Sequence, residues 1–120
     1  MSKVAITSEG PTLDDQVDPR FGRAAGFVLV DPDTMQTEYL DNGQSQVMAQ
    51  GAGIQAAQIV AKAGADWVLT GYVGPKAFKV LEAAGIKVGQ NLEGLTVREV
   101  VDRFKSGGIT MAQAANKMGR

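Results

Sequence analysis

Runs of apolar residues, divided by glycine, proline and aspartate, predict an alternation of strands and helices along the chain. Five short runs are rich in Val, Ile, Leu or aromatic residues and have the length of strands. They are residues 3–7, 26–30, 36–40, 66–70 and 86–88. Asp31-Pro32-Asp33-Thr34 lies between the second and third runs and suits a tight turn, so we expect an antiparallel hairpin there.

Three further segments have the pattern of helices. The first covers residues 54–63 and the second residues 75–84, and a glycine follows each of them. The third opens with Thr96 and Glu99, which match the two ends of a capping box. Its apolar residues then follow at helical spacing: Val97, Val100, Val101 and Phe104. Residues 42–53 are rich in polar residues and glycine, and we expect a loop there.

The predicted order β-β-β-α-β-α-β-α belongs to the α/β class and implies a mixed five-stranded sheet with helices packed on it. We assign residues 1–106 to one domain, because a chain of 120 residues suits a single compact unit. Residues 107–120 form a C-terminal tail rich in Ala, Met and Gln, for which we expect a frayed helix and assign no role.

Composition narrows the chemistry. The chain has no cysteine and no histidine, which excludes disulfides, thiolate-bound metals and the usual Ser–His–Asp or Cys–His catalysis. A metal would need oxygen or thioether ligands, or would arrive in a cluster that brings its own ligands. The net charge of −1 gives no reason to expect nucleic acid as a partner.

Nothing in the sequence indicates a membrane or an exported protein. No apolar run approaches the roughly 20 residues that a bilayer span requires. Met1-Ser2-Lys3 leads straight into the first strand, without the apolar core of a signal peptide. We therefore expect a soluble, cytoplasmic protein.

The first candidate site is Arg20-Phe21-Gly22-Arg23, between the first two strands. Guanidinium groups are weakly hydrated, forked donors that suit a large, diffuse anion. A solvated loop whose Phe21 fills the edge of the core explains the segment equally well. The sequence leaves both interpretations open.

The second candidate is Gly51-Ala52-Gly53-Ile54, at the opening of the first predicted helix. A helix start offers unpaired N–H groups and a partial positive charge, which favour an anion. With Ala56 the segment matches G-x-G-x-x-A, but a dinucleotide site needs that motif directly after a strand, and here a loop intervenes. Glycines that simply permit a tight entry to the helix are the alternative.

The third candidate is the segment of residues 70–76. It follows a strand that we expect near the centre of the sheet, at the edge where ligands gather in α/β proteins. Lys76 and Lys79 place positive charge at a helix start, where it opposes the helix dipole, and a bound anion would offset that cost. Lysines that extend into water are the alternative.

Two other groups are weaker candidates for metal binding. Asp14, Asp15 and Asp18 share one loop and could hold a hard cation, but they lack the regular spacing of an EF-hand. Met48 could offer a thioether to a soft metal such as Cu(I), or it could fill a gap in the core.

Several stretches, spread from about Val4 to Phe104, together resemble the dinitrogenase iron–molybdenum cofactor biosynthesis family. The stretches are residues 21–24 (Phe-Gly-Arg-Ala), 51–57 (Gly-Ala-Gly-Ile-Gln-Ala-Ala), 71 with 74–78 (Gly-Pro-Lys-Ala-Phe), and 83–88 (Ala-Ala-Gly-Ile-Lys-Val). The resemblance implies a ribonuclease H-like fold and the binding of preformed metal–sulfur clusters or their precursors. The members that this chain looks most like imply a mixed molybdenum–copper sulfide cluster, held without covalent bonds to the protein.

Two features of the sequence limit what the resemblance implies about metal ligation and activity. Many relatives have a histidine just before Phe-Gly-Arg, where this chain has Arg20, so direct histidine ligation is excluded. The fold analogy also raises nuclease activity, which needs carboxylates on the first strand to hold two metal ions. Residues 4–7 contain no acidic residue, so we do not expect this chain to hydrolyse nucleic acid.

Our leading hypothesis is a non-enzymatic protein that binds and carries a preformed anionic metal–sulfur cluster. Its cationic residues would neutralise the cluster, and its aromatic and aliphatic residues would shield it from water. The candidate binding residues are Arg20, Phe21, Gly22, Arg23, Met48, Gly51, Gly53, Ile54, Gly71, Tyr72, Gly74 and Lys76. The alternative is a regulatory or scaffold module that docks a partner protein without metal, and a nucleotide-binding domain is a third option. We expect a monomer without nucleic-acid or membrane partners.

Overall fold

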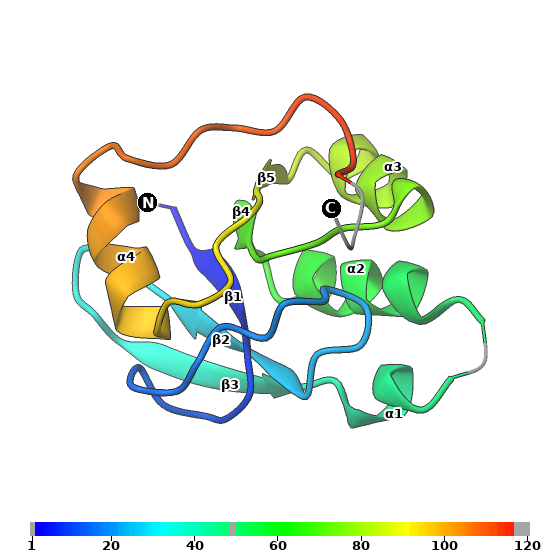
Figure 1. The fold of residues 1–120 in the computed structure, drawn as a ribbon, viewed down its shortest axis with the longest axis horizontal. Helices are drawn as coiled ribbons and strands as arrows, with labels where there is room; N and C mark the ends of the chain where they lie inside the picture. Colours follow the sequence, from blue (N-terminus) through cyan, green and yellow to red (C-terminus); the bar gives the residue numbers. More distant parts are fainter. Residues whose placement is uncertain (1, 49, 117–120) are drawn as a thin grey trace.

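The computed structural model describes residues 2–48 and 50–116, and its centre is a five-stranded sheet in the order β3-β2-β1-β4-β5 (Figure 1). The strands are β1 (Val4–Ser8), β2 (Gly26–Val30), β3 (Thr37–Asp41), β4 (Trp67–Leu69) and β5 (Lys87–Gly89). β2 runs antiparallel to both β1 and β3, whereas β4 runs parallel to both β1 and β5. The mixed five-stranded sheet predicted from the sequence is confirmed.

The predicted hairpin is formed by β2 and β3. Gly26 pairs with Asp41 at one end of the hairpin, and Val30 pairs with Thr37 at the other. The turn is held by a carboxylate oxygen of Asp31, which accepts a hydrogen bond from the backbone N–H of Asp33 at 2.9 Å. An Asx turn of this kind is what the Asp-Pro-Asp-Thr segment favours.

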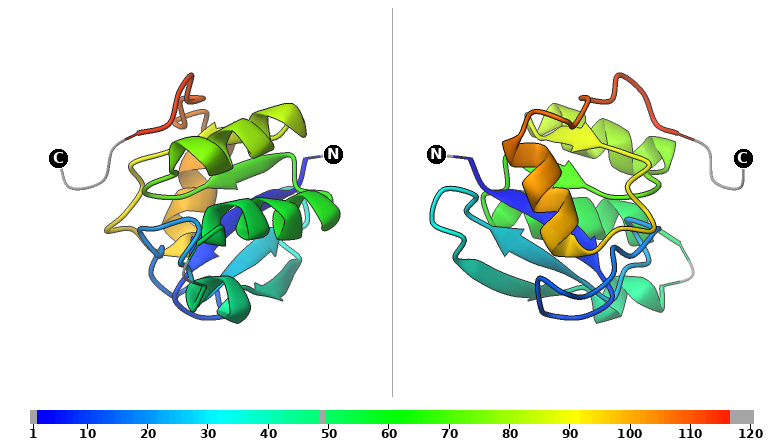
Figure 2. Two further views of the ribbon diagram at one scale, coloured as in Figure 1. Left: turned by 90° about the vertical axis from the view of Figure 1, so that its right-hand side faces the viewer. Right: turned by 60° about the vertical axis from the view of Figure 1, so that its left-hand side comes forward.

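Successive residues of a strand point to opposite faces, and here both faces of the central strands are buried. α2 (Ala52–Lys62) and α3 (Pro75–Ala83) cover one face, and α4 (Val97–Lys105) covers the other (Figure 2). The strands turn Ala5, Phe27, Leu29, Val68 and Val88 towards α2 and α3. They turn Val4, Ile6, Val28, Val30 and Leu69 towards α4. Burial on both faces explains why these strands read as continuous apolar runs.

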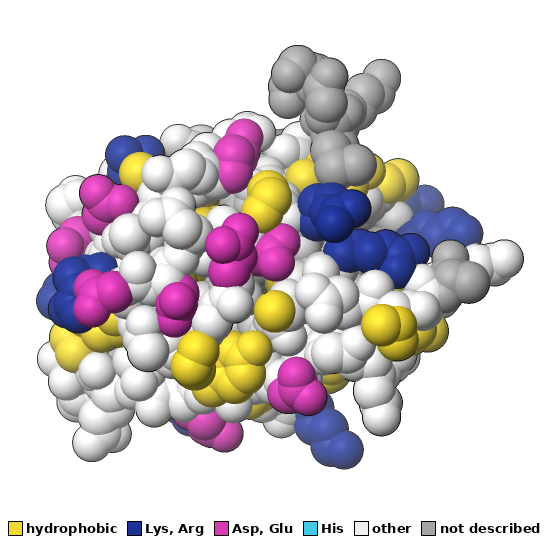
Figure 3. Space-filling model, turned by 60° about the horizontal axis from the view of Figure 1, so that its bottom comes forward, with side chains coloured by type: hydrophobic (Ala, Val, Ile, Leu, Met, Phe, Trp, Pro, Cys, Tyr) yellow, Lys and Arg dark blue, Asp and Glu magenta, His cyan; other side chains and the backbone are white. Residues whose placement is uncertain are grey.

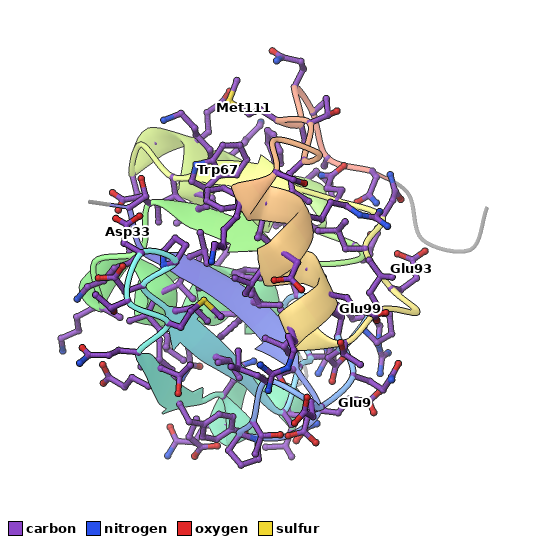
Figure 4. All side chains as sticks on the ribbon, turned by 90° about the vertical axis from the view of Figure 1, so that its left-hand side faces the viewer. Glu9, Asp33, Trp67, Glu93, Glu99 and Met111 are labelled. Atoms are coloured by element: carbon purple, nitrogen blue, oxygen red, sulfur yellow. The ribbon has the colours of Figure 1, made fainter. Side chains whose placement is uncertain are left out.

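α4 forms where the sequence predicts it. The Thr96 hydroxyl accepts a hydrogen bond from the Glu99 N–H at 3.2 Å, and the Glu99 carboxylate accepts one from the Thr96 N–H at 2.8 Å. These two bonds are the predicted capping box. Near the other end of the helix, Phe104 packs edge-on against Trp67, with ring centroids 5.3 Å apart. Figure 4 shows Trp67 at this end of α4. None of the helices within the described residues has the length and hydrophobicity that crossing a bilayer requires.

One helix differs from the sequence-based expectation. α1 (Gly43–Gln46) lies inside the segment that we expected to be a loop, and α2 begins at Ala52 rather than at residue 54. α1 is a single turn of polar residues, so no apolar periodicity could mark it. Its N-cap, Asn42, is almost fully buried and bonds to the segment after residue 20, so tertiary contacts rather than local propensity place this turn.

The C-terminal tail is not the frayed helix that we expected over its described part. Residues 109–116 form no helix, and Figure 1 shows this orange-to-red segment crossing from α4 to the side of the molecule that carries α3. On the way, the Ala112 N–H donates to the Val88 carbonyl of β5 at 2.7 Å. The remaining tail residues, 117–120, lie outside the described part of the chain.

Candidate functional site

A cavity of about 400 Å³ opens beside the carboxyl ends of the parallel strands. Its volume falls within the roughly 300–1,000 Å³ that small-molecule and cofactor sites occupy. Three segments enclose it: the loop of residues 20–23, the start of α2 and the start of α3. The lining residues are Arg20, Gly22, Arg23, Gly51, Ala52, Gly53, Ile54, Tyr72, Gly74, Pro75, Lys76 and Ala77. We call this cavity the pocket.

Backbone hydrogen bonds join the first and third of these segments. The Tyr72 N–H donates to the Pro19 carbonyl at 2.7 Å, and the Phe21 N–H donates to the Tyr72 carbonyl at 2.9 Å. Arg20 and Tyr72 therefore form a parallel bridge beyond the ends of the sheet strands. On its other side, the 20–23 loop is held by Asn42, whose side-chain amide donates to the Gly22 carbonyl at 3.3 Å and to the adjoining Ala24 carbonyl at 2.9 Å. Segments that are distant along the chain are thus held together by hydrogen bonds and form one wall of the pocket.

Close packing of small residues brings the second segment against the other two. A Cβ atom added at Gly22 would lie 2.8 Å from the Gly53 Cα, and one added at Gly53 would lie 2.9 Å from the Ala77 Cβ. Real Cβ atoms do not approach other atoms so closely. Glycine at both positions therefore lets the 20–23 loop, α2 and α3 touch, and this contact fixes the spacing of the pocket walls.

Two helices begin at the pocket. Gly51 is the N-cap of α2 and Gly74 is the N-cap of α3, and neither glycine has a side chain that could cap the helix. Neither helix has an acidic residue in its first turn, whereas α4 has both a Thr96 cap and Glu99. Because the first N–H groups of a helix have no intrahelical acceptor, both starts present donors and a partial positive charge to the pocket.

Three cations, Arg20, Arg23 and Lys76, add formal positive charge to this lining, and none of the described lining residues is an Asp or a Glu. Arg23 is anchored, because its guanidinium donates to the Gln46 carbonyl at 3.2 Å and also to the Met48 carbonyl. In Figure 3, a cluster of Lys and Arg side chains lies on the right of the face, while the Asp and Glu side chains at its centre are without such a cluster and those on its left lie beside other Lys and Arg side chains. The pocket is locally basic in a chain of net charge −1.

Most of the residues predicted for a site lie around the pocket, and three lie elsewhere. Phe21 is 1% exposed and packs in the core against Phe27, with ring centroids 5.5 Å apart, so its ring does not line the pocket. This position agrees with the structural alternative considered for Phe21. Gly71 packs against the Pro19 carbonyl and is not part of the lining. The Met48 side chain lies outside the lining, with its methyl carbon 3.6 Å from where a Cβ of Gly51 would be.

The carboxylates considered for a hard cation are engaged separately. Asp14 pairs with Arg98 at 3.0 Å, and Asp18 accepts from the Arg20 N–H at 3.3 Å. Hydrogen bonds from the Thr12 hydroxyl and backbone N–H lower the pKa of Asp15 below its usual value. Within residues 2–48 and 50–116, no three residues of the types His, Cys, Asp and Glu lie together as metal ligands could.

Sequence reasoning did not identify Asn116 as part of this region. Its side-chain amide donates to the Gly71 carbonyl at 2.8 Å, and its carbonyl oxygen accepts from the Val73 N–H at 3.0 Å. No local signal could have revealed it, because the residue comes 43 positions after Val73 and follows a segment without regular structure.

Comparison with known proteins then places the chain. Residues 2–107 match the family model described as dinitrogenase iron-molybdenum cofactor. The chain belongs to this family. As a family member it is similar to the orange protein of Desulfovibrio gigas, whose structure in the apo form shares 65% sequence identity with it. The TM-score is 0.95, and the alignment covers 98% of both chains.

The chain is also similar to two more distant proteins. A Thermotoga protein of the DUF35 family is 34% identical, with a TM-score of 0.84 and coverage of 99% of this chain and 100% of that one. An uncharacterised protein of Methanocaldococcus jannaschii is 28% identical over 91 residues, which are 73% of each chain. Membership in the family connects the chain with metal-cluster cofactors.

Proposed function

We propose that the pocket binds a preformed anionic metal–sulfur cluster and that the protein carries this cargo in the cytoplasm without a catalytic step. The observation that carries the proposal is the lining itself. Three cations and two uncapped helix starts face one cavity, and no carboxylate of the described residues lines it. Such a lining attracts a multiply charged anion and offers it many N–H donors.

The residue types also favour a cluster that arrives complete. The chain has no cysteine or histidine to ligate a metal, and the described residues contain no group of carboxylates that could do so. A cluster whose metals are already saturated by sulfide needs no protein ligand. It needs positive charge, hydrogen-bond donors to its sulfur atoms and some apolar cover, which Ile54 and Tyr72 would provide beside the cations.

The cargo that we propose is a mixed molybdenum–copper sulfide cluster. The support for this choice is the sequence resemblance, together with the 65% identity to the orange protein of Desulfovibrio gigas over 98% of both chains. Molybdenum and copper held by sulfide suit a site of N–H donors and cations, since the soft ligands are in the cluster itself.

The alternative function is the docking of a partner protein without metal. One observation favours it: Val47 is 82% exposed, next to Met48 at the margin of the pocket. Against it, the ring of Phe21 is buried and cannot contribute to such an interface.

The first experiment is a visible absorption spectrum of the purified protein before and after addition of tetrathiomolybdate and copper, followed by desalting and metal analysis. We expect a charge-transfer band that stays with the protein, together with stoichiometric molybdenum and copper. Loss of both the band and the metals on desalting would reject a Mo–Cu cargo. In that case, specific capture of a partner protein by the metal-free protein would favour the docking function.

Lys76→Glu separates binding from folding. The substitution changes the pocket charge by two units, so we expect retention of the Mo–Cu probe to fall at least about tenfold. The same carboxylate lies in the first turn of α3, where it should leave stability unchanged or raise it by about 0.3–1 kcal/mol. Retention of the probe by desalting and urea denaturation would measure the two effects.

Lys79→Glu is the matched control for this experiment. Lys79 is exposed on the same helix but does not line the pocket, and its substitution changes the net charge by the same amount. Equal losses of probe in the two variants would mean that overall charge, and not the pocket, governs binding. Arg23 is less suitable for charge reversal, because its guanidinium also holds the carbonyls of Gln46 and Met48.

A further inference from the structure

We propose that Asn116, in the C-terminal tail, is a positioning residue that holds one wall of the pocket in place and slows the loss of its cargo. The inference deepens the proposed function and rests on it. The wall in question is the loop of residues 71–74, which leaves β4, carries Tyr72 into the pocket and ends at the start of α3.

The backbone of this loop is bonded on both of its edges. The N–H and C=O of Tyr72 face one way and bond to Pro19 and Phe21. The Gly71 carbonyl and the Val73 N–H face the other way, as alternate groups of an extended segment do. The Asn116 side chain bonds to both, donating to the carbonyl at 2.8 Å and accepting from the N–H at 3.0 Å. The Gly71 carbonyl also accepts from the Asn91 N–H at 2.9 Å, so the Val73 N–H is the group that depends on Asn116.

The Asn116 side chain bonds to this loop as the backbone of a neighbouring strand would. Its amide has the same donor and acceptor as a peptide group, so it completes the pairing that the 19–21 segment provides on the opposite edge. Val73 is fully buried, and without Asn116 its N–H loses this acceptor, which is costly for a buried donor. The Asn116 amide also donates to the Asn91 side-chain oxygen at 3.1 Å, which fixes the orientation of the group.

Other contacts hold the tail in this position. Ala112 is bonded to β5, and the Gln90 side chain donates to the Ala114 carbonyl at 3.2 Å. Ala112 and Ala115 pack against the core on the α2–α3 side. The tail is therefore tethered independently of Asn116, and replacing Asn116 should free the loop without detaching the whole segment.

The test compares Asn116→Ala with Gln90→Ala, which removes a tail-to-body hydrogen bond that does not involve the 71–74 loop. In the cargo-free protein we expect the Val73 amide to exchange with solvent about threefold to tenfold faster in Asn116→Ala, as loss of one hydrogen bond implies. In Gln90→Ala the exchange rate of this amide should stay near that of the unsubstituted protein. The melting temperature should fall by a few degrees in Asn116→Ala, because a buried donor loses its acceptor, and by less in Gln90→Ala.

The second measurement uses protein loaded with tetrathiomolybdate and copper. Asn116→Ala should release this probe about threefold to tenfold faster, with association nearly unchanged, because the wall is loosened while the cations remain. Gln90→Ala should release it at nearly the rate of the unsubstituted protein.

Unchanged exchange at Val73 in Asn116→Ala, or equal acceleration in both variants, would overturn the proposal. Faster exchange without faster release would also overturn the role in retaining cargo. If the unsubstituted protein does not retain the probe, the proposed Mo–Cu cargo is wrong, and the exchange experiment still decides whether Asn116 holds the wall.

Discussion

At the scale of a single residue, Gly53 constrains the pocket because it has no side chain. A methyl group at this position would lie 2.9 Å from the Ala77 Cβ and push α2 from α3. Overpacking of this kind costs about 1–3 kcal/mol, which exceeds the gain of up to about 1 kcal/mol from replacing glycine in a helix. We expect Gly53→Ala to lower the free energy of unfolding by up to about 2 kcal/mol and to weaken retention of the Mo–Cu probe, as urea denaturation and desalting would show.

A second substitution distinguishes crowding from a loss of backbone freedom. In Gly53→Ala with Ala77→Gly, the space taken at one position is returned at the other. Probe retention should recover in the double variant, because the approach of the two helices is restored. If the double variant retains no more probe than Gly53→Ala alone, the close contact does not set the pocket.

At the scale of single residues, the sequence indicates which residue types belong to the site better than it indicates where their side chains point. Arg20, Arg23 and Lys76 are recognisable as cations beside glycines, and the fold brings them together. For Phe21 the sequence could not decide between pocket and core, since the choice depends on Phe27, a neighbour supplied by β2. Asn116 could not be found, because its partners come from a loop far away in the chain.

Among the elements, α4 offers a change in stability that should leave the site alone. It packs on the face of the sheet opposite to α2 and α3, and none of its residues lines the pocket. Figure 4 shows Glu9, Glu93 and Glu99 on one side of the molecule, around the start of this helix. The start of α4 is thus closed by its own cap and surrounded by acidic residues, unlike the two helix starts at the pocket.

Thr96→Ala removes the cap of α4. We expect the free energy of unfolding to fall by about 1 kcal/mol, as loss of an N-cap hydroxyl usually causes, with probe retention unchanged. Glu99→Gln is the control, because glutamine can still complete a capping box and should cost less. Chemical denaturation would measure both variants, and a loss of probe in Thr96→Ala would show that the two faces of the sheet are coupled.

The sequence predicted the elements whose periodicity is strong and missed the one without any. α2, α3 and α4 carry apolar faces, and glycine, proline or a capping box marks their ends, so their positions differ from prediction by at most a few residues. α1 consists of one glycine and three polar residues and depends on Asn42, whose partners lie in the segment of residues 22–24. The helical turn of α1 therefore depends on tertiary contacts that the rest of the fold supplies.

For the whole molecule, the pattern of strands and helices was sufficient for a mixed sheet but not for the order of its strands. The position of β1 between β2 and β4 follows from pairings between residues 63 positions apart, such as Val4 with Trp67. Nothing local encodes such a pairing. The contrast between a basic pocket and a chain of net charge −1 likewise arises from the assembled fold, since Lys76 comes from a different segment than Arg20 and Arg23.

The tail covers a free edge of the sheet, and this has a consequence for self-association. β5 is an edge strand, and the Ala112 N–H bonds to its Val88 carbonyl. Because uncovered edges pair with other chains, we expect a variant that ends at Gly108 to form concentration-dependent oligomers, measurable by light scattering. Asn116→Ala keeps the cover and should not do so, and a truncated protein that stays monomeric would contradict this role of the tail.

The C-terminal tail thus contacts both the edge strand β5 and the 71–74 loop that forms one wall of the pocket. A single proteolytic cut between α4 and Ala112 would remove both protections, since everything beyond the cut could dissociate from the body. Trimmed molecules in a purified sample should therefore be the ones that release a bound Mo–Cu probe first and the ones that precipitate on storage.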